Sequence, residues 1–182
     1  MIRSRGGELA IGSLSQDSNQ SMYRVRVEEP PQKPLQPVRN TNPFEYARQM
    51  GVLKEQLTRF EILFQAWEDI SATSISEFEE YVEPILTQPR TAQLSDVWGA
   101  VRRAELFLTE EDLSWSQTPH EYLILVTDGE DNVGVTPMTL TSGATVLLVN
   151  GSGALGCLAS LKPHRFEAAA AAVRWIIARE EK

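Results

Sequence analysis

The pattern of apolar and polar positions begins with two predicted strands near the N-terminus. Residues 8–14 predict one strand, and residues 22–27 alternate between apolar and charged side chains. The apolar face of this second segment carries Tyr23, Val25 and Val27. Alternation with a period of two is typical of a half-buried strand. Because the intervening residues 15–21 are polar turn formers, the segment predicts a β-hairpin with a long turn.

A Pro-rich linker over residues 28–42 leads to a region that we predict to be a helical insertion, residues 43–88. Asn42 is the expected N-cap and Pro43 the first helical residue. Apolar residues then recur at alternating spacings of four and three: Tyr46, Met50, Leu53, Leu57, Phe60, Phe64 and Trp67. This heptad pattern predicts a helix over residues 43–67 that packs either on the domain itself or on a partner helix.

Two signals predict that this helix ends and that a second one begins. We interpret Asp69-Ile-Ser-Ala-Thr73 as a helix end with a cap, although its D-x-S-x-T spacing of oxygens could also hold a hard cation. Ser74-Ile-Ser-Glu77 matches a capping box. Pro84 is expected to bend or end the second helix.

The remaining chain alternates between helical and strand patterns. Ser95 and Asp96 are expected to cap a helix with apolar residues on or near its buried side: Val97, Val101, Ala104, Leu106 and Leu108. Two continuous apolar runs, Tyr122–Val126 and residues 144–149, predict strands that are buried on both faces. Residues 164–182 predict a closing helix with inward residues Phe166, Ala169, Val173, Ile176 and Ile177. The expected fold class is an α/β domain of three layers.

Composition limits the possible functions. The 182 residues carry a formal net charge of −8, which argues against non-specific binding of nucleic acid. Two histidines and the single Cys157 leave little material for a His-based metal site or a disulfide. No apolar run approaches the roughly 20 residues of a membrane span, and the first residues lack the apolar core of a signal peptide. We therefore expect a cytoplasmic protein without a membrane span.

Enzyme motifs are weak or missing. Residues 151–156 match G-x-G-x-x-G, but Pro163 interrupts the helix that a dinucleotide site needs, so we interpret them as a glycine-rich turn. There is neither a G-x-S-x-G elbow nor a P-loop. Glu130 and Asp131 could do acid–base work, but a solvated acidic loop is the preferred interpretation. We expect that the protein is not an enzyme.

Several segments together resemble von Willebrand factor A (VWA) domains. The strand that runs into Thr127-Asp128-Gly129 is similar to the family's late strand and Thr-Asp-Gly turn. Ser95-Asp-Val-Trp-Gly-Ala-Val-Arg-Arg-Ala104 resembles its Thr-Asp-x-x-x-Ala-Leu helix start, with Ser95 in place of the threonine. The strand over residues 143–149 and the terminal helix resemble the family's last two elements. Residues 7–12 and 23–27 resemble its second and third strands.

The resemblance implies a Rossmann-like sheet with helices on both faces and a metal-ion-dependent adhesion site. In the family, a D-x-S-x-S loop, a threonine and the Thr-Asp-Gly aspartate surround Mg²⁺, and a partner's carboxylate completes the shell. Ser95 and Asp128 would be the metal ligands here. The D-x-S-x-S loop belongs to a strand that would precede Gly7, so the resemblance implies a fold that is incomplete at the N-terminus and a partial, weak Mg²⁺ site.

Two functions follow as hypotheses. The first is a VWA-like module over residues 1–182 that binds a protein partner through a divalent cation at Ser95 and Asp128. The second is a metal-independent scaffold or oligomerisation protein that uses the heptad helix 43–67.

Overall fold

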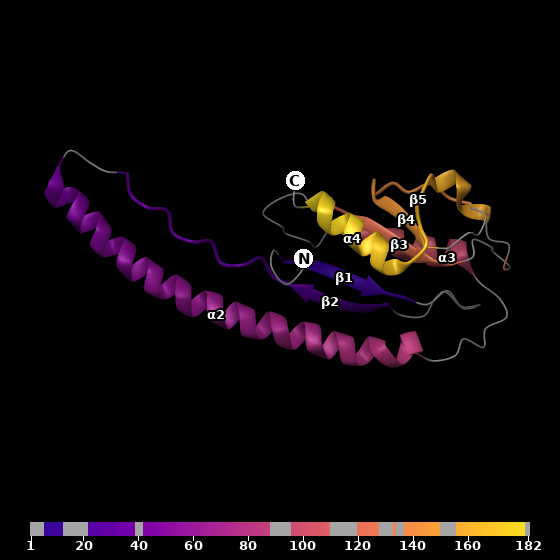
Figure 1. Cartoon of the computed structure of the whole chain (residues 1–182), viewed down its shortest axis with the longest axis horizontal. Coiled ribbons are helices and arrows are strands. Elements are labelled where there is room, and N and C mark those ends of the chain that lie inside the picture. The colour runs from indigo at the N-terminus through magenta and orange to yellow at the C-terminus, as the bar shows by residue number, and fades with distance from the viewer. Residues whose placement is uncertain are drawn as a thin grey trace. The chain divides into compact units, whose positions relative to one another are not determined.

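The computed structural model describes residues 6–12, 22–38, 42–87, 96–109, 120–127, 133, 137–149 and 156–180. Over these residues the protein is mixed α/β, with long and short helices and two small sheets (Figure 1). The chain divides into two compact units. The first contains residues 1–10 and 23–87, and the second contains residues 11–22 and 88–182.

The first unit begins with a two-stranded sheet of β1 (Gly7–Ile11) and β2 (Tyr23–Val27). The strands run in opposite directions in Figure 1, which agrees with the predicted hairpin, although β1 ends three residues earlier than predicted. Val25 and Val27 are buried as the alternation predicts. Tyr23 is 43% exposed, and its ring lies 6.3 Å from the ring of Tyr81.

The rest of the first unit is dominated by a single helix, α2 (Pro43–Thr87), of 45 residues. Asn42 caps it as predicted, because its Oδ1 accepts hydrogen bonds from the backbone N–H groups of Phe44 (3.1 Å) and Glu45 (3.4 Å). In Figure 1, α2 extends well beyond β1 and β2, and residues 28–38 run alongside this extension. The indole Nε1 of Trp67 fixes the start of that segment by donating to the carbonyl of Glu28 at 2.8 Å.

The predicted break within residues 69–77 is wrong, because α2 runs through it. Ser and Thr compete with a helix when their side chains bond the backbone in other conformations. Here the hydroxyl of Thr73 instead donates to the carbonyl of Asp69 at 2.9 Å, one turn back, and Gln65 donates to the Asp69 side chain at 3.0 Å. Pro84 lies within the last turn of α2, whose described range closes at Thr87.

The heptad seam lies on the least exposed face of α2. Leu53 is 5% exposed, and the same face continues past the predicted helix end to Ser71 (3%) and Val82 (6%). The seam residues Tyr46, Leu57, Phe60, Phe64 and Trp67 are half-buried, and Met50 is 41% exposed. Of the two alternatives for this seam, the first unit therefore favours packing within the chain.

The second unit contains a three-stranded parallel sheet in the order β3-β4-β5. Its strands are β3 (Tyr122–Val126), β4 (Thr145–Val149) and β5 (His164–Phe166). The two longer strands confirm the predictions from the continuous apolar runs. Alternate residues of β3 and β4 point to opposite faces, as strand geometry requires.

Each face of this sheet packs on a different helix. One core contains Leu123, Leu125, Val146 and Leu148 together with residues of α3 (Val97–Leu108): Val97, Trp98, Val101 and Ala104. The other contains Leu147 and Val149 together with Ala172 and Ile176 of α4 (Ala169–Glu180). The sheet is therefore covered on both sides, which accounts for strands without alternation.

The single helix predicted over residues 164–182 is corrected in two ways. Its first three residues form β5, which pairs with Leu147–Val149, and the helix begins only at Ala169. A short 3-10 helix, η1 (Gly156–Leu161), precedes β5. Of the predicted inward residues, Ile176 is buried, whereas Val173 and Ile177 are 45% and 38% exposed. In the described part of the chain, no helix has the length and apolar character needed to cross a membrane.

Candidate functional site

The carboxyl end of the parallel sheet is the first candidate site. Val126 of β3 pairs with Val149 of β4, so the two strands end side by side. The N–H of Thr127 continues the ladder by donating to the carbonyl of Val149 at 3.2 Å. In open α/β sheets, ligands bind at this edge. The predicted ligand Asp128 is the next residue, and it lies outside the described residues, as do Gly129, Glu130 and Asp131.

The start of α3 is the second half of the predicted metal site. Asp96 is the N-cap, with its Oδ1 accepting from the N–H of Gly99 at 2.7 Å, and it is 6% exposed. This confirms the predicted cap at Ser95-Asp96 and assigns the capping to Asp96. Ser95 itself lies outside the described residues. Within the described ranges no cluster of three or more His, Cys, Asp or Glu side chains could hold a metal ion.

A buried carboxylate that sequence reasoning missed lies on the same helix. Glu105 is 6% exposed and accepts hydrogen bonds at Oε1 from the backbone N–H groups of Thr141 and Ser142, the second at 2.8 Å. The hydroxyls of the same two residues donate to Glu105 at 2.6 and 2.7 Å. Gly143 follows with φ of 77°, a conformation that favours glycine. Glu105 therefore fixes the turn that leads into β4.

The pKa directions of two carboxyls agree with this geometry. Burial alone would raise the pKa of Glu105, but the hydrogen bonds from Thr141 and Ser142 outweigh it and hold the pKa below its usual value. Burial, and then the negative charge of Glu105, raise the pKa of the Glu121 carboxyl. The Oε2 of Glu121 is buried, and no hydrogen-bond partner occurs for it among the described residues. The Glu105 carboxylate therefore has a structural role, since both of its oxygens accept hydrogen bonds from the turn at Thr141 and Ser142.

A third polar cluster joins the start of β3 to the end of α4. The hydroxyl of Tyr122 donates to Oε1 of Glu180 at 2.5 Å, and Nδ1 of His120 lies 2.8 Å from the same oxygen. Burial, and next the hydrogen bond to Glu180, raise the pKa of Tyr122 to about 12. This cluster lies at the opposite end of β3 from Thr127. It attaches the end of the terminal helix to the start of β3.

Replacing Tyr122 with phenylalanine is expected to cost about 1–2 kcal/mol of unfolding free energy at pH 7, because the lost hydrogen bond involves a carboxylate. Since folding raises this pKa from 10.0 to about 12, the hydrogen bond stabilises the fold below pH 10 and is lost as the pH rises toward 12. Wild type should therefore lose stability over that interval, and the variant should lose less. Denaturant titration at several pH values measures both, with Tyr81→Phe as the control on an exposed ring.

Two shallow depressions occur on α2 of the first unit. One, of about 370 Å³, is lined by the linker residues Leu35 and Pro37 and by residues of α2 between Arg48 and Gln56, which include Val52 and Leu53. The other, of about 500 Å³, lies along Thr58, Glu61, Ile62, Gln65, Ala66 and Asp69. Both are open surfaces along the long helix and neither is an enclosed cavity.

Comparison of the chain with protein-family models, with curated proteins and with solved structures finds no match.

Proposed function

We propose that this protein is a VWA-like, non-enzymatic binding module, which engages a protein partner through a divalent cation held by Ser95 and Asp128. The observation that carries the proposal is the joint ending of β3 and β4, where the ladder reaches Thr127, one residue before Asp128. An aspartate at this edge is well suited to a hard cation such as Mg²⁺, which prefers oxygen ligands and keeps open positions for water or a partner's carboxylate.

The architecture of the second unit supports this proposal. Its parallel sheet carries α3 on one face and α4 on the other, and α3 begins two residues after Ser95. A Rossmann-like, three-layer sheet has this arrangement, and the family that the sequence resembles has the same arrangement with its metal ligands on loops at one edge. We include the helical region 43–88 as an insertion into that pattern, in the part of a fold where specificity usually resides.

Calorimetric titration with Mg²⁺ and Mn²⁺ tests the metal site. Wild type is expected to give weak heats, because Ser95 and Asp128 supply only part of an octahedral shell. Asp128→Ala should abolish these heats, since it removes the one charged ligand. Asp131→Ala is the matched control, because it removes an acidic side chain three residues away that is not a proposed ligand. Equal heats from wild type and Asp128→Ala would contradict the assignment.

A second candidate function, recruitment of a protein partner by α2 without metal, is favoured by the exposed apolar residues of that helix. Val52, Leu63 and Ile70 are 50%, 49% and 67% exposed, although a helix of this length ordinarily turns such side chains inward. Exposed apolar surface that follows one element is typical of a protein-binding site.

A further inference from the structure

Four of the seven exposed large apolar residues described on α2 lie on one side of the helix, whereas Phe44, Met50 and Ile62 lie elsewhere around it. Val52, Leu63, Ile70 and Tyr81 are each between 49% and 69% exposed. Their separations are 11, 7 and 11 residues, which correspond to nearly whole numbers of turns at 3.6 residues per turn. The four side chains therefore form one stripe, which we call the outer stripe. It lies about a quarter of a turn from the buried seam of Leu53, Ser71 and Val82.

The outer stripe is symmetric about its own centre. The midpoint of Val52 and Tyr81 coincides with the midpoint of Leu63 and Ile70, between residues 66 and 67. In a pair of helices related by a two-fold axis perpendicular to them, residue i of one copy meets residue j of the other, and j meets i. An axis at this midpoint would set Leu63 against the partner's Ile70 and Val52 against the partner's Tyr81. Ala66 at the centre is small and lets the two helices approach.

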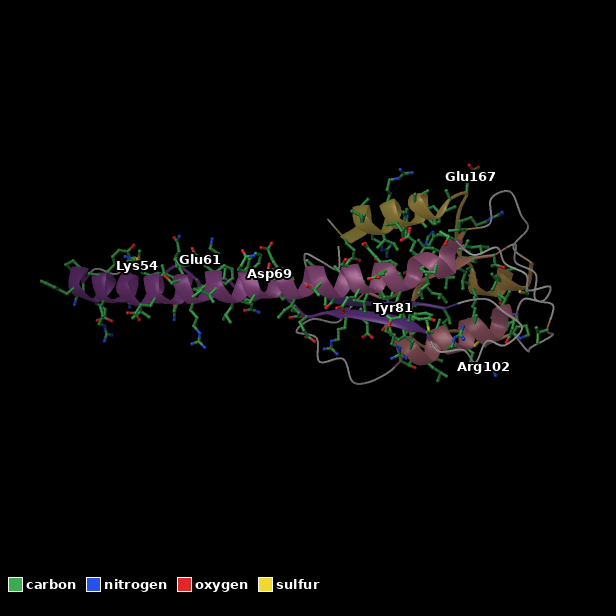
Figure 2. All side chains as sticks on the ribbon, turned by 90° about the horizontal axis from the view of Figure 1, so that it is seen from below. Lys54, Glu61, Asp69, Tyr81, Arg102 and Glu167 are labelled. Atoms are coloured by element: carbon green, nitrogen blue, oxygen red, sulfur yellow. The ribbon has the colours of Figure 1, made fainter. Side chains whose placement is uncertain are left out.

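The charges of α2 favour the same arrangement. Its first 18 residues, 43–60, contain three basic side chains and two acidic ones: Arg48, Lys54, Arg59, Glu45 and Glu55. Residues 61–87 contain seven acidic side chains and no basic one: Glu61, Glu68, Asp69, Glu77, Glu79, Glu80 and Glu83. Figure 2 shows Lys54, Glu61, Asp69 and Tyr81 in this order along the helix. A parallel pair would bring the two acidic halves together, whereas an antiparallel pair sets each acidic half against the less acidic, basic-containing half.

We propose that α2 pairs with α2 of a second copy of this chain, antiparallel and centred at residues 66–67, through the outer stripe. This inference rests on the second candidate function and names its partner. Arg59 lies within one turn of the partner's Glu77 in this register, because Arg59 and Glu77 follow the stripe residues Val52 and Ile70 by seven residues each and lie on the same line of the helix. The partner's Tyr81, whose ring also lies 6.3 Å from the ring of Tyr23 in its own copy, meets Val52 beside the depression that Leu35 lines. The heptad seam stays inside each copy.

Two isoleucines of equal exposure test whether the outer stripe is the dimer interface. Ile70 and Ile62 are both 67% exposed, but Ile62 lies roughly 80° away around the helix, outside the outer stripe. Wild type is expected to dimerise reversibly in sedimentation equilibrium. Ile70→Lys should raise the dimer Kd by about tenfold or more, because it acts twice in a symmetric interface and buries a charge against the partner's apolar Leu63. Ile62→Lys should leave the Kd unchanged.

Cysteine cross-linking tests the direction of the pair in full-length Cys157→Ser protein. In an antiparallel pair, Val52→Cys alone is too far from its counterpart to cross-link, whereas Val52→Cys combined with Tyr81→Cys yields a covalent dimer. A parallel pair would reverse this result for Val52→Cys alone and would overturn the proposed register. Equal weakening by Ile70→Lys and Ile62→Lys would overturn the proposed surface. A protein that stays monomeric would overturn self-association, while recruitment of a different protein by α2 would stand.

Discussion

Replacing Trp98 with alanine is expected to lower the free energy of unfolding of the second unit by about 3–5 kcal/mol. Trp98 is 1% exposed and lies in the core that joins α3 to Leu123 and Leu125 of β3 and to Leu148 of β4. The substitution removes the largest fully buried side chain of the described chain and leaves a cavity that its neighbours only partly fill. This loss is a large fraction of the stability of an ordinary domain.

Chemical denaturation followed by far-ultraviolet circular dichroism measures this effect. Leu106→Ala is the matched control, because it truncates a side chain of the same helix that is 66% exposed, and it should change stability by less than about 1 kcal/mol. Trp98→Phe retains most of the apolar volume and should lower the free energy of unfolding by less. It can therefore be measured if the alanine variant does not fold. Similar losses for Trp98→Ala and Leu106→Ala would contradict the assignment of Trp98 to the core.

The elements that the sequence predicts well are those whose signal is local. β3 and β4 are short apolar runs between polar segments, and α3 has a cap and a periodic apolar face within 14 residues. The continuity of α2 is different, because Ser and Thr near residue 73 fit a cap and a helix interior equally well. The helix interior is favoured over a cap only because the buried face of α2 continues to pack as far as Val82. β5 is three residues long, too short for any period to be visible.

The polar sites likewise divide into those whose partners are close in the sequence and those whose partners are distant. Asp96 is recognisable as a cap because its partner, Gly99, is three residues away. Glu105 was missed because its partners, Thr141 and Ser142, are 36 and 37 residues away in the sequence. One signal was present, since Glu105 follows Trp98 and Val101 on the buried side of α3, where a charge needs a partner. Ser95 and Asp128 lie outside the described residues, so the metal site stays a prediction.

Replacing Glu105 with alanine is expected to cost about 3 kcal/mol at pH 7, because buried hydrogen-bond donors of Thr141 and Ser142 lose a charged acceptor. Glu167→Ala in the same unit is the control, since it removes an exposed carboxylate. The loss should also depend on pH. Folding lowers the pKa of Glu105, so its stabilisation is present above the usual value of 4.5 and disappears as the pH falls through the folded-state pKa.

The difference between wild type and Glu105→Ala should therefore shrink as the pH is lowered from 7 toward 3, as measured by denaturant titration at each pH. Glu121 acts in the opposite sense, because its pKa is raised and its charge weakens the fold at neutral pH. Comparing the two proteins in a Glu121→Gln background removes that contribution. Glu121→Gln alone should raise the melting temperature at pH 7. A Glu105→Ala penalty that stayed constant down to pH 3 would show that Glu105 stabilises the turn by packing, and that its charge contributes nothing.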